Sequence, residues 1–328
     1  MDHENFTQLL RHFVESDTWE NEKLAKSLNV SLEVLLDISK FLSNLGVLIE
    51  TPTNSTTKML RNFLPYSTND LHAGLETNIL SNSQLYLFVS INSTNTYLKE
   101  QELSKPLLLC ITEHQSQGRG RRGKDWCSPM VGNIYFSARR RVKISSQEIG
   151  CVSLIVGLAI IKALTLEGFT DLSIKWPNDI YQDGKKLAGV LIEVVSMNAE
   201  VSDIIIGIGL NIRTSQKYQK EINQPWANLT SAKPSADINR STLLAKIINH
   251  IIGDLDELEK STSENLLLTW PKYDYLLNRN VLVHQHNSTQ YGICRGINEI
   301  GELLVESDGA IIAVNAGEVS VRTQGPSK

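Results

Sequence analysis

Six short apolar segments between residues 84 and 270 constrain the fold of this chain more than any other feature. They read YLFVSI, LLLCIT, NIYFSARR, LSIKW, KLAGVLIEVV and DIIIGIGLNI, and runs of this kind are typical of strands. Helical patterns near 147–167 and 241–259 alternate with them. This alternation predicts an α/β (α+β) domain with a mixed sheet over residues 84–270, with enough apolar residues for one sizeable core.

The N-terminal segment, residues 1–66, has the pattern of a winged helix-turn-helix domain. A helical pattern at 21–28 is followed by a tight turn and by a second helical pattern from Ser31 to near Gly46. Serine is a favourable N-cap, and glycine commonly ends a helix. In a DNA-binding domain of this kind the second helix enters the major groove.

The charge of this segment does not favour strong DNA binding. Residues 1–66 contain six lysines and arginines against nine aspartates and glutamates, and the second helix carries Glu33 and Asp37 against Lys40. Contacts between cations and phosphates supply most non-specific DNA affinity. Two alternatives therefore stay open: a DNA-binding domain, or a helical domain that has kept its shape and lost its affinity for DNA.

After about residue 279 the sequence changes to short alternating runs. NVLVHQH, YGICRGI, ELLVES, AIIAVN and EVSVR are separated by turn-rich joints such as NEIG and SDGA. We predict a small antiparallel β-barrel over residues 279–328.

The composition is typical of a globular protein with two or three domains. The chain has 328 residues, of which 41% are hydrophobic, and a net charge of −4. The longest apolar run, 151–161, is too short to cross a bilayer, and no signal-peptide pattern is present. Four scattered cysteines without metal-ligand spacing fit a reducing compartment. We expect a cytoplasmic protein without membrane association, zinc or disulfides.

Residues 118–123, GRGRRG, match the G-x-G-x-x-G dinucleotide fingerprint on spacing alone. That fingerprint requires a helix after the last glycine, whereas Pro129 and Gly132 interrupt the following segment. The loop is strongly basic, so we expect it to bind an anion whose charge grows during a reaction, such as a phosphate. A solvated basic loop is the alternative.

A second polar motif, KWPND at 175–179, follows an extended segment. Pro177 favours extended backbone before it, which places Lys175 at a strand end beside Asn178 and Asp179. A lysine there can neutralise a phosphate while the carboxylate holds a metal ion or positions an attacking amine. A hairpin turn that contains an ion pair is the alternative.

Two further motifs lie in the last two apolar segments. Lys186 begins KLAGVLIEVV, so we expect it at the rim of the sheet. Gly207 and Gly209 lie inside DIIIGIGLNI, where glycine indicates close approach of a flat ligand to the backbone, and Asn211 suits an adenine edge. A bulge, or a lysine whose stem covers apolar surface, is the alternative at these positions.

GRGRRGKDW, KWPNDI, KLAGVLIE and GIGLN, in this order and at this spacing, resemble bacterial biotin protein ligases, and NSTNTYL at 92–98 matches as well. The resemblance extends to both terminal segments and so covers nearly the whole chain. It implies an ATP-dependent, AMP-forming ligase that makes biotinyl-5′-AMP and transfers biotin to a lysine of the biotin carboxyl carrier protein of acetyl-CoA carboxylase. It also implies Mg²⁺ and a homodimer, for which DIIIGIGLNI could offer an exposed strand edge.

The resemblance assigns roles to residues by motif. The implied biotin-binding residues are Ser93, Thr94, Asn95, Gln115, Gly118, Arg119, Gly120, Arg121 and Lys186. The residues implied for ATP or adenylate are Arg121, Arg122, Trp126, Lys175, Asn178, Asp179, Lys186, Gly209, Asn211, Glu318 and Arg322. The implied catalytic residues are Arg121, Lys186, Lys175 and Asp179, with Asp179 also a Mg²⁺ ligand. Trp126 would stack on adenine, and Asn211 would bind its amino edge.

Many bacterial members of the family also repress biotin synthesis genes by binding operator DNA as dimers. The sequence departs from that pattern, because the predicted wing, ETPTNSTTKMLRN, lacks the usual Gly-Lys-Gly turn and the preceding helix is acidic. Two other functions stay open: a lipoate-type protein ligase with the same catalytic architecture, and a ligand-sensing DNA-binding regulator without ligase activity.

Overall fold

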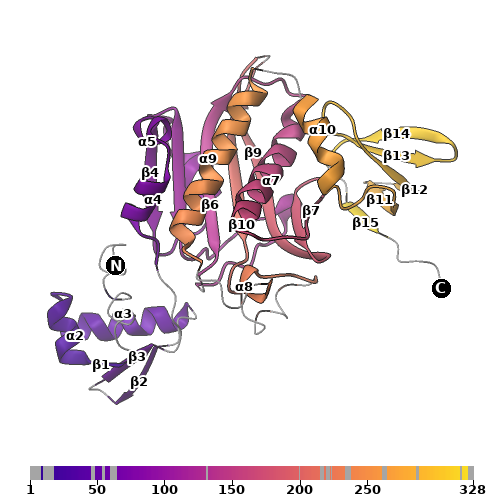
Figure 1. Cartoon of the computed structure of the whole chain (residues 1–328). Coiled ribbons are helices and arrows are strands. Elements are labelled where there is room, and N and C mark those ends of the chain that lie inside the picture. The colour runs from indigo at the N-terminus through magenta and orange to yellow at the C-terminus, as the bar shows by residue number, and fades with distance from the viewer. Residues whose placement is uncertain are drawn as a thin grey trace, which may run out of the picture.

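A computed structural model of the chain consists of three parts: an N-terminal helical segment with a small sheet, a central α/β unit and a C-terminal sheet (Figure 1). The residues that the structure describes are 9, 18–45, 49–53, 56–59, 65–130, 132–198, 200–214, 218, 222, 224–232, 238–260, 264–285, 288–317 and 320–323.

A mixed sheet of seven strands forms the centre of the molecule. Its order is β4 (Ser83–Phe88), β5 (Leu107–Thr112), β6 (Ile134–Val142), β10 (Ser202–Leu210), β9 (Lys185–Met197), β8 (Asp179–Gln182) and β7 (Leu172–Lys175). β4 and β5 are parallel, and the other neighbouring pairs are antiparallel. All six apolar segments contribute to strands, which confirms the mixed α/β prediction.

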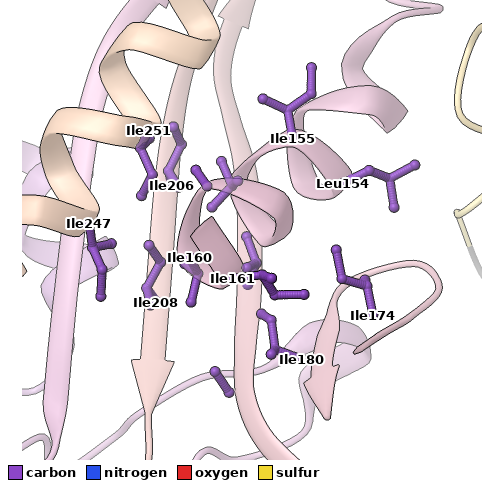
Figure 2. Close-up of a cluster of buried hydrophobic side chains, with 14 of the residues drawn as sticks. Leu154, Ile155, Ile160, Ile161, Ile174, Ile180, Ile206, Ile208, Ile247 and Ile251 are labelled. Carbon is purple, nitrogen blue, oxygen red and sulfur yellow. The ribbon is translucent and has the colours of Figure 1, made fainter. Parts of the chain in front are cut away.

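Two long helices, α7 (Ile149–Leu166) and α9 (Arg240–Leu258), pack together on one face of this sheet. Figure 2 shows their side chains against β10, with Ile160, Ile206 and Ile251 in the interface. α7 meets the length and hydropathy of a membrane-spanning helix, but 61% of it is buried inside the protein. A helix that is apolar on all sides is expected where both neighbours, here the sheet and α9, cover it.

The opposite face of the sheet carries the short helix α6 (Thr94–Glu100). Leu98 of α6 packs with Leu108 and Ile205, whereas Ile204 and Ile206 belong to the core under α7 and α9. Successive residues of a strand point to opposite faces, so α6 lies across the sheet from the two long helices.

In the residues described between 18 and 59, the N-terminal segment has the helices α2 and α3 and a small antiparallel sheet. Its elements are β1 (Thr18–Glu20), α2 (Asn21–Ser27), α3 (Leu32–Asn44), β2 (Ile49–Thr53) and β3 (Thr56–Met59). Ser31 Oγ accepts a hydrogen bond from Val34 N at 3.2 Å, which confirms the predicted N-cap of α3. Gly46, the predicted end of this helix, lies outside the described residues.

Three short helices connect these parts, and the sequence patterns did not predict them. They are α4 (Thr68–Gly74) and α5 (Thr77–Asn82) before the central sheet, and α10 (Glu264–Tyr273) after α9. A further turn of helix, α8 (Leu229–Ala232), follows β10.

The C-terminal strands form an antiparallel sheet in the order β14 (Ala310–Val314), β13 (Leu303–Ser307), β12 (Ser288–Ile297), β11 (Asn280–Gln285) and β15 (Ser320–Thr323). Each of the predicted runs therefore contributes to a strand within the described residues. Within the described part of the chain β14 and β15 stay unpaired with each other, so the sheet is open there.

The expectation that DIIIGIGLNI offers an exposed strand edge is wrong. β10 lies between β6 and β9 and pairs with both along its full length, and each of its residues is buried. A run that is apolar on both faces is expected in the middle of a sheet. The two edges of the central sheet are β4 and β7.

Candidate active site

A cavity of about 880 Å³ lies among the start of α6, the glycine-rich loop at 118–124, the β7–β8 hairpin and strands β9, β10 and β15. The predicted site residues in its wall are Ser93, Thr94, Asn95, Gln115, Arg119, Gly120, Arg121, Arg122, Trp126, Lys175, Asn178, Asp179, Lys186, Gly209 and Arg322. Motifs that are far apart in the sequence therefore meet at a single cavity.

Two predicted residues are placed differently, and a third lies outside the described residues. Gly118 lines a neighbouring cavity, and a Cβ there would lie 2.4 Å from the carbonyl oxygen of Trp126. Asn211 is 6% exposed, is not part of the cavity wall, and its Oδ1 accepts a hydrogen bond from Thr214 Oγ1 at 3.3 Å. Glu318 lies outside the described residues. In this structure Asn211 therefore does not face the cavity.

One end of the cavity is lined by neutral polar side chains. Thr94 donates to Gln115 Oε1 from its backbone N at 2.9 Å and from its hydroxyl at 3.2 Å. Ser137 Oγ lies 2.6 Å from both Thr94 Oγ1 and Asn95 Oδ1. Ser93, the N-cap of α6, is as deeply buried as Thr94 and Asn95. Such a prearranged polar cluster suits a compact, neutral ligand head with several hydrogen-bonding groups.

The rest of the cavity is positively charged. Its charged wall residues are Arg119, Arg121, Arg122, Lys124, Lys175, Lys186 and Arg322 against Asp125 and Asp179. Lys186 Nζ lies 2.8 Å from Asp179 Oδ1 and 5.2 Å from the ring centre of Trp126. Burial lowers the pKa of Lys175, while the charge of Asp179 acts in the opposite direction. This excess of cations suits a polyphosphate.

A second cavity, of about 470 Å³, lies between α7, α9 and α10 and is mainly apolar. Its charged wall residues, Lys162, Asp254 and Glu257, are net negative, so it does not suit a nucleotide.

KWPND forms the turn of the β7–β8 hairpin. Lys175 and Asp179 are direct partners in the strand register, and the peptide bond before Pro177 is cis. The hairpin of the alternative is therefore confirmed, whereas the ion pair of Asp179 is with Lys186 of β9 and not with Lys175 of the turn. The hairpin does not exclude a site, because this turn borders the cavity. Asn178 donates to the carbonyl oxygen of Val190 at 2.7 Å, and its Oδ1 accepts from Arg121 at 3.3 Å.

The glycine-rich loop is not a dinucleotide turn, because only a 3-10 turn, Arg121–Gly123, follows its second glycine. Arg119 pairs with Glu193 at 2.8 Å. Arg121 donates to the carbonyl oxygens of Ala316 and Gly317, which follow β14 in the C-terminal segment. Burial lowers the pKa of the Arg121 guanidinium, and nearby Asp179 partly offsets this effect. The loop is thus attached to the sheet on one side and to the C-terminal segment on the other.

Gly207 and Gly209 leave room for two flat groups of the protein itself. A Cβ on Gly207 would lie 2.3 Å from Asn95 Oδ1, and a Cβ on Gly209 would lie 2.2 Å from Trp126 Cε2. The groups that approach these glycines in this structure are an amide and an indole ring of the chain itself, so the expected flat ligand stays a prediction.

Sequence patterns did not single out Glu193, Tyr181 or Ser137. Glu193 interrupts an apolar strand. A charged residue at such a position indicates a partner of opposite charge or a hydrogen-bond donor nearby, because charged side chains are rarely buried without a partner. Lys175 Nζ donates to Tyr181 Oη at 3.5 Å. The position of Ser137 depends on its pairing with Gly207 across β6 and β10, which only the strand register reveals.

Comparison with known proteins identifies the family of the chain. The family model described as "Biotin/lipoate A/B protein ligase family" matches residues 87–211, and "Biotin protein ligase C terminal domain" matches residues 276–322. A relative from Escherichia coli (strain K12), named bifunctional ligase/repressor BirA, is 35% identical over 235 residues, which are 71% of this chain and 72% of that protein. A relative of the same name from Bacillus subtilis (strain 168) is 23% identical over 305 residues, 92% of this chain and 93% of that protein.

A similar solved structure is the biotin protein ligase from Aquifex aeolicus in complex with biotin and ATP. It is 26% identical, has a TM-score of 0.64, and the match covers 74% of this chain and 99% of that one. The chain belongs to the biotin/lipoate A/B protein ligase family. Within this family, the identity to the Escherichia coli relative and the match to the biotin-specific C-terminal model confirm the resemblance to bacterial biotin protein ligases.

Proposed function

We propose that the protein activates biotin with ATP to biotinyl-5′-AMP and pyrophosphate, and then transfers biotin to a lysine of the biotin carboxyl carrier protein. The observation that best supports this reaction is the division of one cavity into a neutral polar end and a cationic end. The polar end suits the ureido head of biotin, and the cationic end suits the triphosphate of ATP. A carboxylate held between the two ends would face the α-phosphate.

The polar end would bind biotin through Ser93, Thr94, Asn95, Gln115 and the backbone at Gly118 and Gly120. Lipoate is the alternative substrate, but its dithiolane ring has no N–H or carbonyl group. It could not use the hydrogen-bonding capacity that these buried side chains keep beyond their bonds to one another, and a buried donor or acceptor left unused costs about 1–3 kcal/mol. The polar end therefore favours biotin.

The cationic end would stabilise the charge that develops when the carboxylate attacks the α-phosphate. Lys186 and Arg121 would contact the reacting oxygens, and Lys175, Asn178 and Arg122 would bind the polyphosphate. Positioning and charge stabilisation suffice for this step, and no covalent nucleophile is needed.

Asp179 fits a role in holding Mg²⁺. Its Oδ1 is buried and, although Lys186 is close, it accepts no aligned hydrogen bond from the described residues. In the described part of the chain no group of three or more His, Cys, Asp or Glu gathers to hold a metal ion alone. Mg²⁺ commonly binds one or two carboxylates together with substrate phosphates, where it neutralises phosphate charge. Asp179 would therefore hold a Mg²⁺ ion that arrives with ATP.

Trp126 would stack on the adenine ring, with Gly209 beneath it. Asn211 would bind the amino edge of adenine, for which its side chain must turn from Thr214 toward the cavity. Glu318 and Arg322 would support ATP binding from the C-terminal segment. We propose that this segment forms the small barrel. Biotin-dependent exchange of labelled pyrophosphate into ATP tests the first half reaction, and transfer of labelled biotin to a carrier domain tests the second. Exchange that depends on lipoate and not on biotin would replace this proposal with the lipoate ligase.

We also propose that residues 1–66 form a winged helix-turn-helix domain, with α3 as the DNA-contacting helix and β2–β3 as the wing. The order of α2, α3 and the β2–β3 hairpin supports this arrangement, as do relatives named ligase/repressor that match over 92% of the chain. Glu33 and Asp37 are exposed on α3, so few phosphate contacts are available and DNA affinity should depend only weakly on salt. Titration with DNA from upstream of biotin synthesis genes, at several salt concentrations, tests this role.

A homodimer would have to use a surface other than β10. β4 is one edge of the central sheet, whereas the outer edge of β7 already accepts a hydrogen bond at Ile174 O from Tyr275 N at 3.0 Å. Light scattering with biotin and ATP present tests whether the protein is a homodimer, and a monomeric mass would contradict the homodimer.

We place the protein in the cytoplasm, consistent with the free thiols of Cys110, Cys127, Cys151 and Cys294.

A further inference from the structure

Glu193, in β9, joins two parts of the cavity that come from distant segments of the chain. Its Oε2 accepts a hydrogen bond from Asn95 Nδ2 at 2.7 Å and another from Arg119 Nη2 at 2.8 Å. Asn95 belongs to the first turn of α6, and Arg119 belongs to the glycine-rich loop. The Glu193 side chain is 22% exposed, so its carboxylate is partly removed from water and depends on these donors.

The first contact determines the orientation of the Asn95 amide. A carboxylate accepts hydrogen bonds and cannot donate them, so Nδ2 must point to Glu193 and Oδ1 to the Ser137 hydroxyl, 2.6 Å away. The opposite orientation would place two acceptors together. Because Ser137 uses one lone pair of Oδ1, the other can accept a hydrogen bond from an N–H group of the ligand.

The second contact attaches the glycine-rich loop to the sheet. Within the loop, Gly120 N donates to Lys124 O at 2.7 Å, and Trp126 N donates to Gly118 O at 2.8 Å. These bonds keep the loop compact but do not attach it to β9. The Arg119 side chain makes that attachment through its ion pair with Glu193.

We propose that Glu193 is a positioning residue that keeps the glycine-rich loop closed over the polar end of the cavity and orients Asn95 toward the ligand. Arg119 then acts as an anchor of the loop, and its guanidinium faces Glu193 and not the ligand. The proposal rests on the proposed function for the identity of the ligand. The anchoring itself is a property of the ligand-free chain.

Three variants test this role. Glu193→Ala removes both contacts, and Glu193→Gln keeps the shape and one acceptor oxygen but removes the charge. Glu200→Ala removes an exposed carboxylate from the turn between β9 and β10 and serves as the matched control. Thermal unfolding of each variant first establishes that the fold is intact.

Trypsin cleavage of the ligand-free loop measures anchoring without any catalytic activity. We expect Glu193→Ala to be cleaved between Arg119 and Lys124 about five times faster than the unchanged protein or more, because an unanchored loop opens more often. Glu193→Gln should lie between the two, and Glu200→Ala should match the unchanged protein. Equal cleavage rates in Glu193→Ala and the unchanged protein would overturn the anchoring.

Pyrophosphate exchange measures the effect on the ligand. We expect the biotin KM of Glu193→Ala to rise about ten-fold or more, the size expected when a charge-assisted hydrogen bond is lost, with kcat changed less than about three-fold. An unchanged biotin KM, or a loss confined to kcat, would overturn the orienting role. If the unchanged protein shows no biotin-dependent exchange, the proposed function fails, while the cleavage experiment still decides the anchoring.

Release of labelled biotinyl-5′-AMP separates the two contacts. Arg119→Ala breaks only the ion pair, so it should speed release, but less than Glu193→Ala, which also removes the contact to Asn95. The double variant should release the intermediate about as fast as Glu193→Ala alone, because both changes break the same ion pair. Additive effects of the two changes would show that Glu193 does not act through Arg119 and would overturn this part of the proposal.

Discussion

Gly207→Ala should impair the binding of biotin, whereas Gly209→Ala should impair the binding of ATP. The two glycines are nevertheless neighbours on one face of β10. A Cβ at Gly207 would lie 2.3 Å from Asn95 Oδ1, and a Cβ at Gly209 would lie 2.2 Å from Trp126 Cε2. Ordinary van der Waals contact begins near 3.4 Å. Each neighbouring group must therefore move by about 1 Å, away from the strand and into the cavity.

The cost at Gly207 follows from the hydrogen bonds of Asn95. A shift of about 1 Å breaks its 2.7 Å bond to Glu193, and a hydrogen bond to a charged group is worth about 1.5–3 kcal/mol. At 1.4 kcal/mol for each factor of ten, the biotin KM should rise roughly ten- to one-hundred-fold. The ATP KM should change little, because Trp126 is not displaced.

The cost at Gly209 has a different origin. Trp126 Nε1 has no hydrogen-bond partner among the described residues, so displacing the ring breaks no such bond. The added methyl group instead pushes the indole ring into the space proposed for adenine, at about 1–3 kcal/mol for overpacking. The ATP KM should therefore rise by roughly five- to one-hundred-fold, with the biotin KM nearly unchanged.

Pyrophosphate exchange, with each substrate varied in turn, measures both constants. The matched control is Gly253→Ala in α9, where a Cβ would meet no atom within 4 Å. That change should leave both KM values unaltered and raise the free energy of unfolding by about 0.5–1 kcal/mol, because glycine is unfavourable inside a helix. Equal effects of the two β10 substitutions on the same substrate would refute the assignment of the two cavity ends.

Three further outcomes follow from the geometry. Lys186→Met should lower kcat for exchange about 10²–10³-fold, because it removes the cation beside Asp179. A kcat within ten-fold of that of the unchanged protein, which corresponds to less than about 1.4 kcal/mol, would contradict this role. Glu113→Gln should lower the free energy of unfolding in urea by about 3–5 kcal/mol, since Arg240, 5% exposed, loses its buried carboxylate partner. Burial lowers the pKa of His114 from 6.5, so the unfolded chain binds the proton of this imidazole more tightly than the folded chain does. The free energy of unfolding should therefore fall as the pH drops below 6.5. In His114→Gln this decrease of the free energy of unfolding should be smaller.

The site residues could be predicted from sequence to the extent that they lie in recognisable motifs. Lys175, Asp179 and Lys186 were predicted in this way, and the cavity brings them together. Glu193 was not, because its role depends on an amide in α6 and a guanidinium in a distant loop. Asn211 was expected to face the ligand, but in the structure it accepts a hydrogen bond from Thr214 and lies outside the cavity wall. The spacing of the motif could not reveal this contact, nor the Trp126 ring that packs against nearby Gly209.

The sequence by itself determined the strands, the long helices, the N-cap at Ser31 and the glycines that permit close approach, because hydrophobic period and turn chemistry act over a few residues. Only the tertiary structure decided which strand lies in the centre of the sheet and which side chains meet across it. Strand order and register depend on contacts between segments that are far apart in the chain, and a shift of one residue would reverse the face of every side chain. The pairing of Ser137 with Gly207, and with it the place of Asn95 beside Glu193, is a consequence of that register.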